Sequence, residues 1–188
     1  MDTSISNNLP AANERLLKKF LRIFPKKIKK VLFINPPDGD SKLFNRKTAD
    51  VGRYPNYPPY GIGCISTKLL KSKIDVKILN LNHEILKECK ENKKFDYDNF
   101  WQKKIDETLK DFNADIIGVG CMFTMTHFSL KNVCKYVSKF KLPISIGGVH
   151  VTNDCFNVIE EMPFVNMAFL KESEISFPNF IRYVNGEE

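Results

Sequence analysis

The chain has 188 residues, of which 43% are hydrophobic and 27% are charged, as in an ordinary globular protein with a single core. No run of about 18 apolar residues predicts a membrane span, and the polar N-terminus lacks the basic-then-apolar layout of a signal peptide. The five cysteines form no CxxC pair. We therefore expect reduced thiols in a cytoplasmic protein, without a structural zinc or a redox dithiol.

The net charge of +7 is concentrated in one segment. Residues 14–30, here called the basic arm, hold eight Lys and Arg residues against one acid, Glu14, and so carry a formal charge of +7 by themselves. The rest of the chain is formally neutral, which is poor evidence for nucleic-acid binding.

The first predicted element is a helix within the basic arm. We expect disorder over residues 1–12 and a helix over 14–24 that Asn13 caps and Pro25 ends. Its apolar residues recur at helical spacing and form one stripe: Leu16, Leu17, Phe20, Leu21 and Phe24. Two interpretations remain open, because such a helix can pack on its own domain, or it can lie on an anionic membrane or dock a partner. We assign residues 1–30 to a flexible N-terminus with this helix, and 31–188 to the folded domain.

From Val31 onward, strand-like and helix-like segments alternate. The predicted strands are 31–35, 75–80, 115–120, 143–147 and 165–170, and the predicted helices are 61–72, 83–91, 97–112, 126–140, 152–161 and 174–184. A loop is expected over 36–59. Strands separated by helices predict right-handed crossovers, and hence an α/β fold with a doubly wound, five-stranded parallel sheet of the flavodoxin-like or Rossmann-like kind.

Three strand ends mark a predicted binding edge. Residues 31–37, 115–124 and 144–150 are apolar runs that break into Pro, Gly, Cys, Thr or His. In an open parallel sheet, ligands bind at the carboxyl ends of the strands, where the strand order reverses.

The loops at this edge disfavour a dinucleotide or a phosphate. A dinucleotide fold needs GxGxxG after the first strand, but residues 35–40 read Asn-Pro-Pro-Asp-Gly-Asp. The prolines lack amide donors and the aspartates repel phosphate. The pairs Gly61/Gly63 and Gly118/Gly120 are only partial matches, and Cys121 stands where a receiver domain needs its aspartate. A P-loop and a flavodoxin-type phosphate loop are absent from the sequence.

The edge instead combines apolar and hydroxyl side chains. After the third strand come Cys121, Met122, Phe123, Thr124, Met125 and Thr126. After the fourth comes Gly147-Gly148, which lets a bulky ligand approach the backbone or simply forms a tight turn. These features indicate a large, flat, mostly apolar ligand that is hydrogen-bonded to amides.

Four short motifs occur in order at this edge: NPP at 35–37, PP-x-G at 58–61, D-x-x-G at 115–118 and GG-x-H at 147–150. In these motifs the chain resembles the cobalamin-binding domain that precedes the catalytic barrel of cobalamin-dependent radical SAM proteins. The resemblance covers about residues 31–185.

The chain departs from that family in several places. The family's GEGE is Lys171-Glu172-Ser173-Glu174 here, and Asn80 replaces the acid that commonly ends the second strand. The first loop has no histidine to ligate cobalt, and the CxxxCxxC motif that holds an iron–sulfur cluster is absent from the sequence. The chain ends at Glu188, about where the barrel would begin, so we expect a fragment of an enzyme or a free-standing corrinoid module.

The resemblance implies cobalamin as the cofactor, with an iron–sulfur cluster and SAM only on a downstream radical SAM barrel in cis or in trans. It implies methyl-transfer chemistry in which this chain alone is not catalytic. The residues that it places at the cofactor are Asn35, Pro36, Pro37, Pro59, Tyr60, Gly61, Cys121, Met122, Thr124, Thr126, Gly147, Gly148, Val149, His150 and Glu172.

Several side chains keep a second interpretation. His150 contacts the cofactor or stabilises its turn, and neither His150 nor His127 is expected to ligate cobalt. Cys121 lines the core or touches the ligand, and Trp101 is expected to pack the charged insert onto the sheet. The competing hypothesis for the whole chain is a non-catalytic α/β domain that binds a partner protein or another small molecule.

Overall fold

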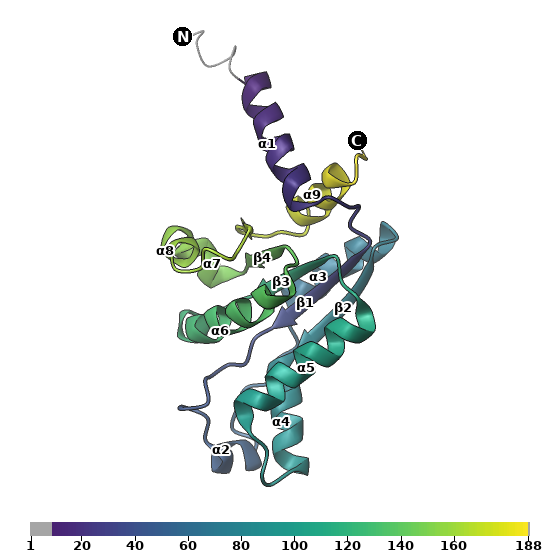
Figure 1. Cartoon of the computed structure of the whole chain (residues 1–188). Helices are drawn as coiled ribbons and strands as arrows, with labels where there is room; N and C mark the ends of the chain where they lie inside the picture. The colour runs from purple at the N-terminus through teal and green to yellow at the C-terminus, as the bar shows by residue number, and fades with distance from the viewer. Residues whose placement is uncertain (1–8, 188) are drawn as a thin grey trace.

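The computed structural model describes residues 9–187, with side chains from Glu14 onward except that of Leu17. Its centre is a parallel five-stranded sheet in the order β2-β1-β3-β4-β5 (Figure 1). The strands are β1 (Lys30–Asn35), β2 (Asp75–Asn80), β3 (Ile116–Gly120), β4 (Ile144–Gly147) and β5 (Met167–Phe169). This arrangement confirms the predicted Rossmann-like α/β fold.

The burial of the strands follows their place in the sheet. In the central strands β1 and β3 nearly every residue is buried, whereas the edge strand β2 exposes Lys77 and Ile78. The strand order changes direction between β1 and β3. The carboxyl ends of these two strands therefore flank the crevice where doubly wound sheets bind ligands.

Helices cover both faces of the sheet. The cluster on one face joins sheet residues to α4 (Leu81–Glu91), α5 (Tyr97–Phe112), α6 (His127–Val137), α7 (Val149–Asn153) and α8 (Cys155–Glu160). The cluster on the other face joins them to α3 (Tyr60–Lys71) and α9 (Ser176–Val184). Trp101 on α5 is buried in the first cluster and meets Tyr136 of α6 edge-on at 5.2 Å.

Some helix boundaries differ from the predictions. The helix expected over 152–161 is two helices, α7 and α8, because Asp154 between them has a non-helical φ of −134° and ψ of 36°. The loop 36–59 contains α2 (Arg46–Asp50), whose first turn is capped by the Asn45 side chain. The 126–140 helix is α6 flanked by the 3₁₀ turns η1 (Thr124–Thr126) and η2 (Ser138–Phe140).

The N-terminal helix begins earlier than predicted. Helix α1 spans Leu9–Ile23, so residues 9–12 are helical and Asn13 lies inside the helix instead of capping it. Pro10 does not prevent this, because proline is accepted in a first turn. The disorder predicted for residues 1–8 lies outside the described residues.

The C-terminal half of α1 is anchored to the domain while the helix projects away from the sheet (Figure 1). Phe20 and Phe24 meet Phe180 of α9 edge-on, with ring centroids at 5.5 and 5.4 Å. Ile28 is buried, and the Asn185 side chain bonds to both its amide and its carbonyl at 2.7 and 2.9 Å. The segment between α1 and β1 is thus part of the packed domain.

Candidate functional site

The carboxyl edge of the sheet brings together predicted site residues from several elements. The loops after β3 and β4 are joined by two backbone hydrogen bonds, from Cys121 N to Gly147 O at 2.8 Å and from His150 N to Cys121 O at 3.3 Å. The first turn of α3 reaches the same place, because a Cβ on Gly120 would lie 3.2 Å from Ile62 Cδ1. The ends of β3 and β4 and the start of α3 therefore form one surface.

The loop after β1 is held to the neighbouring helices. Pro36 and Pro37 are buried, and the Asn35 amide donates to Asn80 Oδ1 at 3.1 Å. The Gly39 carbonyl accepts from Tyr97 Oη at 2.6 Å and from Ser129 Oγ at 3.2 Å. This loop is a fixed border of the edge.

Within that loop, Asp38 is partly buried beside Asn82. The Asn82 amide donates to Asp38 Oδ2 at 3.0 Å, and burial raises the pKa of Asp38 above its ordinary value. A carboxylate in this position disfavours an anionic ligand at the β1 loop.

Apolar side chains at the edge face solvent. Met122 is 64%, Phe123 48% and Met125 81% exposed in the loop after β3, and Tyr60 at the start of α3 is 82% exposed. With Val149 of α7, also exposed, these residues are here called the edge patch. Thr124, Gly148 and Glu172, also predicted to contact the ligand, are exposed as well.

Two pairs of glycines at this edge have different explanations. Gly148 has φ of +111°, and a Cβ there would lie 2.3 Å from the Cys121 carbonyl oxygen. A Cβ on Gly147 would lie 3.2 Å from Phe169 O. Contact with the protein's own backbone thus accounts for Gly147 and Gly148, whereas a Cβ on Gly61 or Gly63 would have no atom within 4 Å.

Cys121 and Thr126 support the β3 loop from beneath. Both are buried, with the Cys121 Sγ 3.3 Å from Thr126 Oγ1, which in turn donates to Phe123 O at 2.8 Å. Burial is the main reason that the pKa of the Cys121 thiol is raised. The thiol is therefore neutral at physiological pH and holds the loop that carries Met122 and Phe123.

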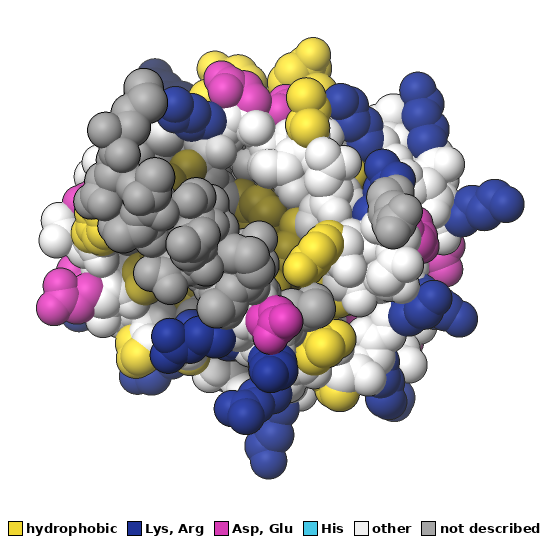
Figure 2. Space-filling model, turned by 90° about the horizontal axis from the view of Figure 1, so that it is seen from above, with side chains coloured by type: hydrophobic (Ala, Val, Ile, Leu, Met, Phe, Trp, Pro, Cys, Tyr) yellow, Lys and Arg dark blue, Asp and Glu magenta, His cyan; other side chains and the backbone are white. Residues whose placement is uncertain are grey.

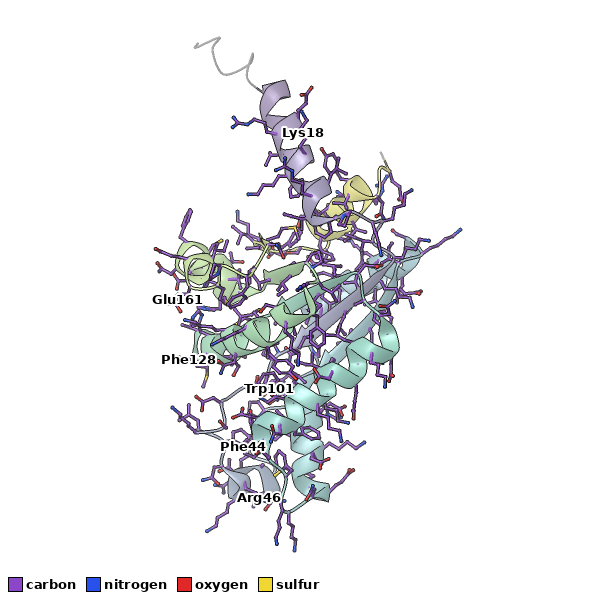
Figure 3. All side chains as sticks on the ribbon, viewed as in Figure 1. Lys18, Phe44, Arg46, Trp101, Phe128 and Glu161 are labelled. Carbon is purple, nitrogen blue, oxygen red and sulfur yellow. The ribbon has the colours of Figure 1, made fainter. Side chains whose placement is uncertain are left out.

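His127 of α6, His150 of α7 and Glu161 at the end of α8 form a cluster that is not evident from the sequence; Glu161 is labelled in Figure 3. His127 Nδ1 lies 2.9 Å from His150 Nε2, and His127 Nε2 lies 3.3 Å from Glu161 Oε2. Lys131 Nζ donates to the same carboxylate at 2.7 Å, which is the main reason that the pKa of Glu161 is lowered. The i, i+4 spacing puts His127 and Lys131 on one face of α6, but no local pattern pairs them with Glu161, which is 34 positions from His127.

His150 is neutral within this cluster. Burial first, and then the neighbouring His127, lowers its pKa. If His127 donates to the ionised Glu161, it accepts at Nδ1 from His150, which leaves His150 Nδ1 as a buried acceptor without a partner among the described residues. Because His150 is 2% exposed, its ring lies below the edge patch.

The cavity at β4 does not coincide with the edge patch. It has a volume of about 260 Å³ and lies at the opposite end of β4, where its lining includes Ile23, Pro143, Ile144 and Phe164. Residues 9–187 contain no group of three His, Cys, Asp or Glu side chains suited to a metal ion. No described helix is long and apolar enough to cross a bilayer.

No family model and no curated protein matches the chain. Among solved structures, it is similar to the solution NMR structure of a de novo designed Rossmann 2x3 fold protein, with 16% identity and a TM-score of 0.43 over 86% of this chain and 94% of the designed one. The strand order itself places the chain in the class of Rossmann-like α/β domains.

Proposed function

We propose that this chain is a corrinoid-binding module that holds cobalamin on the edge patch and serves a radical SAM barrel in cis or in trans. Two features support the proposal: the order of the four sequence motifs, and the exposed apolar surface at the carboxyl edge of the sheet where these motifs lie. The module would act in a reducing cytoplasm, which suits the five free cysteines.

The observation that carries the proposal is the open space at Gly61 and Gly63. Glycine in a helix is less favourable than alanine by about 0.5–1 kcal/mol. Here neither a positive φ nor a close internal neighbour requires glycine at either position. A ligand that lies against the first turns of α3 would explain why both positions are glycine.

The residues present fit a flat, largely apolar ring. Tyr60 precedes Gly61 in the chain, and Met122, Phe123 and Met125 supply further exposed apolar and polarisable surface at the same edge of the sheet. The first amides of α3 have no partner within the helix, and Pro59 at the N-cap makes no side-chain hydrogen bond to them. These amides can donate to the amide carbonyls of a corrinoid.

The residues do not provide a histidine for cobalt. The first loop has none, and His150 is buried with its Nε2 bonded to His127. Bound methylcobalamin would supply a methyl group to chemistry that the barrel initiates, while this chain binds the ring, orients it and excludes water from one face.

Retention of hydroxocobalamin tests the proposal. The full chain is mixed with hydroxocobalamin and desalted, and we expect the corrin absorbance to elute with the protein. Gly61→Leu should abolish this retention by filling the open space, with an unchanged circular dichroism spectrum and a Tm no lower than that of the wild type. Lys71→Leu adds the same side chain at the exposed far end of α3 and should retain the corrin.

Two results would overturn the proposal. One is a folded wild-type chain that retains no corrin at micromolar concentration. The other is equal retention by the wild type and Gly61→Leu, which would place the corrin elsewhere. The first result would leave the competing hypothesis, in which the exposed methionines and aromatic rings of the edge patch dock a partner protein.

A further inference from the structure

We infer that helix α1 is a peripheral docking element for an anionic lipid surface, a role separate from the edge patch. The inference rests on where α1 projects, which of its side chains are exposed, and how its charge is placed.

The structure divides the apolar stripe of α1 into two parts. Its C-terminal part packs on the protein, because Phe20 and Phe24 contact Phe180 of α9. One turn earlier on the same stripe, Leu16 is 51% exposed, and at its flank Leu21 is 53% exposed. The packed side fixes the direction of the helix, which projects away from the sheet (Figure 1), while Leu16 and Leu21 remain exposed.

The charge of α1 is unbalanced and accessible. Four cations along the helix and two just after it are exposed: Arg15, Lys18, Lys19, Arg22, Lys26 and Lys27. Among the described residues, none of these six forms an ion pair. Figure 3 shows Lys18 extending from the projecting helix, and Figure 2 shows Lys and Arg side chains around hydrophobic ones on this side of the molecule.

An anionic bilayer matches both features together. Lys and Arg near the surface are attracted to acidic headgroups, while leucines enter the boundary between headgroups and acyl chains. A second copy of the chain fits less well, since two basic arms of formal charge +7 would repel each other. A nucleic acid would use the cations but would leave Leu16 and Leu21 exposed.

The test is co-sedimentation of the full chain with vesicles of phosphatidylcholine mixed with phosphatidylserine, at about 0.1 M salt, where charges act over about 10 Å. We expect binding to the mixed vesicles and none to phosphatidylcholine alone. Combining Lys18→Glu, Lys19→Glu and Arg22→Glu should weaken binding at least 100-fold, because each cation near such a surface contributes about fivefold.

Two further variants identify the mode of binding. Leu16→Ser combined with Leu21→Ser should weaken binding at least about tenfold, since a buried leucine contributes about 1.5–3 kcal/mol and only part of each side chain is in contact. The matched control reverses three exposed lysines on β2 and α4, Lys77→Glu, Lys87→Glu and Lys90→Glu, and should bind as the wild type does.

Several outcomes would overturn the inference. They are no binding to mixed vesicles, an equal loss in the control, or binding that the leucine variant leaves intact. A dimer in sedimentation velocity that the leucine variant dissolves would assign α1 to self-association. Retained nucleic acid that only the charge reversal removes would assign it to nucleic-acid binding. Corrin retention is measured separately, and none of the α1 variants should alter it.

Discussion

Gly148→Ala tests the packing of the two central loops at the edge. The new methyl group would sit 2.3 Å from the Cys121 carbonyl oxygen and 2.8 Å from its carbonyl carbon, and both atoms belong to backbone. The φ of +111° with ψ of 175° lies in a region that is essentially restricted to glycine. The alanine must therefore change its own conformation and displace the Cys121 backbone.

The expected loss follows from these two effects. A non-glycine residue in this region is less stable by about 1–3 kcal/mol. Cys121 also makes two backbone hydrogen bonds across the loops, to Gly147 and from His150, each contributing about 0.5–1.5 kcal/mol. We expect a decrease of about 2–6 kcal/mol in the free energy of unfolding, a large part of the 5–15 kcal/mol typical of domains.

Urea unfolding followed by circular dichroism measures this loss, and a constant m value would show that the change lies in the native state. Gly63→Ala is the matched control. It meets no atom within 4 Å and its φ is not positive, so it should raise the free energy of unfolding by about 0.4–1 kcal/mol. A Gly148→Ala protein within about 1 kcal/mol of the wild type would refute the close contact between the loops.

Two other predictions concern the core and the histidine cluster. Asn185→Ala leaves the buried amide and carbonyl of Ile28 without partners and should lower the free energy of unfolding by about 2–4 kcal/mol, whereas the exposed Asn179→Ala on the same helix should not change it measurably. The pKa of His150 is lowered from 6.5, so the unfolded chain binds more protons and stability should fall as the pH drops below about 6.5. His150→Gln should reduce this slope by up to about 1.4 kcal/mol per pH unit in urea titrations across that range. Equal slopes in the wild type and His150→Gln would contradict the lowered pKa.

The fold was predictable because its signals are local. Buried strands of five or six residues read as apolar runs between turn residues, and β2 and α5 have the predicted boundaries, 75–80 and 97–112. Asn80 ends β2 and caps α4 by accepting from the His83 amide, an ordinary helix-start signal. The alternation of strands and helices then leaves few topologies for a parallel sheet.

Other features depend on contacts between residues distant in sequence. The break at Asp154 has no strong helix breaker nearby, and the early start of α1 overrides a capping signal at Asn13. His127 and Glu161 are 34 positions apart and meet only when α6 lies beside the end of α8. Local patterns contain no information about such pairs.

The glycines show why contacts between distant residues must be known before substitutions are chosen. In the sequence, Gly147-Gly148 is the more prominent pair. From the sequence alone, bulky substitutions at these two positions would be the natural way to distinguish a ligand site from a simple turn. Because an added side chain at either position would press on backbone of the same protein, a substitution there destabilises the edge whether or not a ligand binds. Gly61 and Gly63 allow side chains to be added without internal contact, so substitutions there separate loss of binding from loss of fold.

The basic arm also contains core residues, Phe24 and Ile28. From the sequence alone, deletion of residues 1–30 would be the most direct test of membrane binding. In the structure, however, this deletion would remove Phe24 and Ile28 from the core and Lys30 from β1. It would also remove the Lys29 and Lys30 amides, which donate hydrogen bonds to Asp115 Oδ2 at 2.7 and 2.9 Å. Loss of vesicle binding by that truncated chain would therefore follow from unfolding as well as from loss of charge. Substitutions on the exposed side of α1, where no core contact is broken, are the ones that can decide.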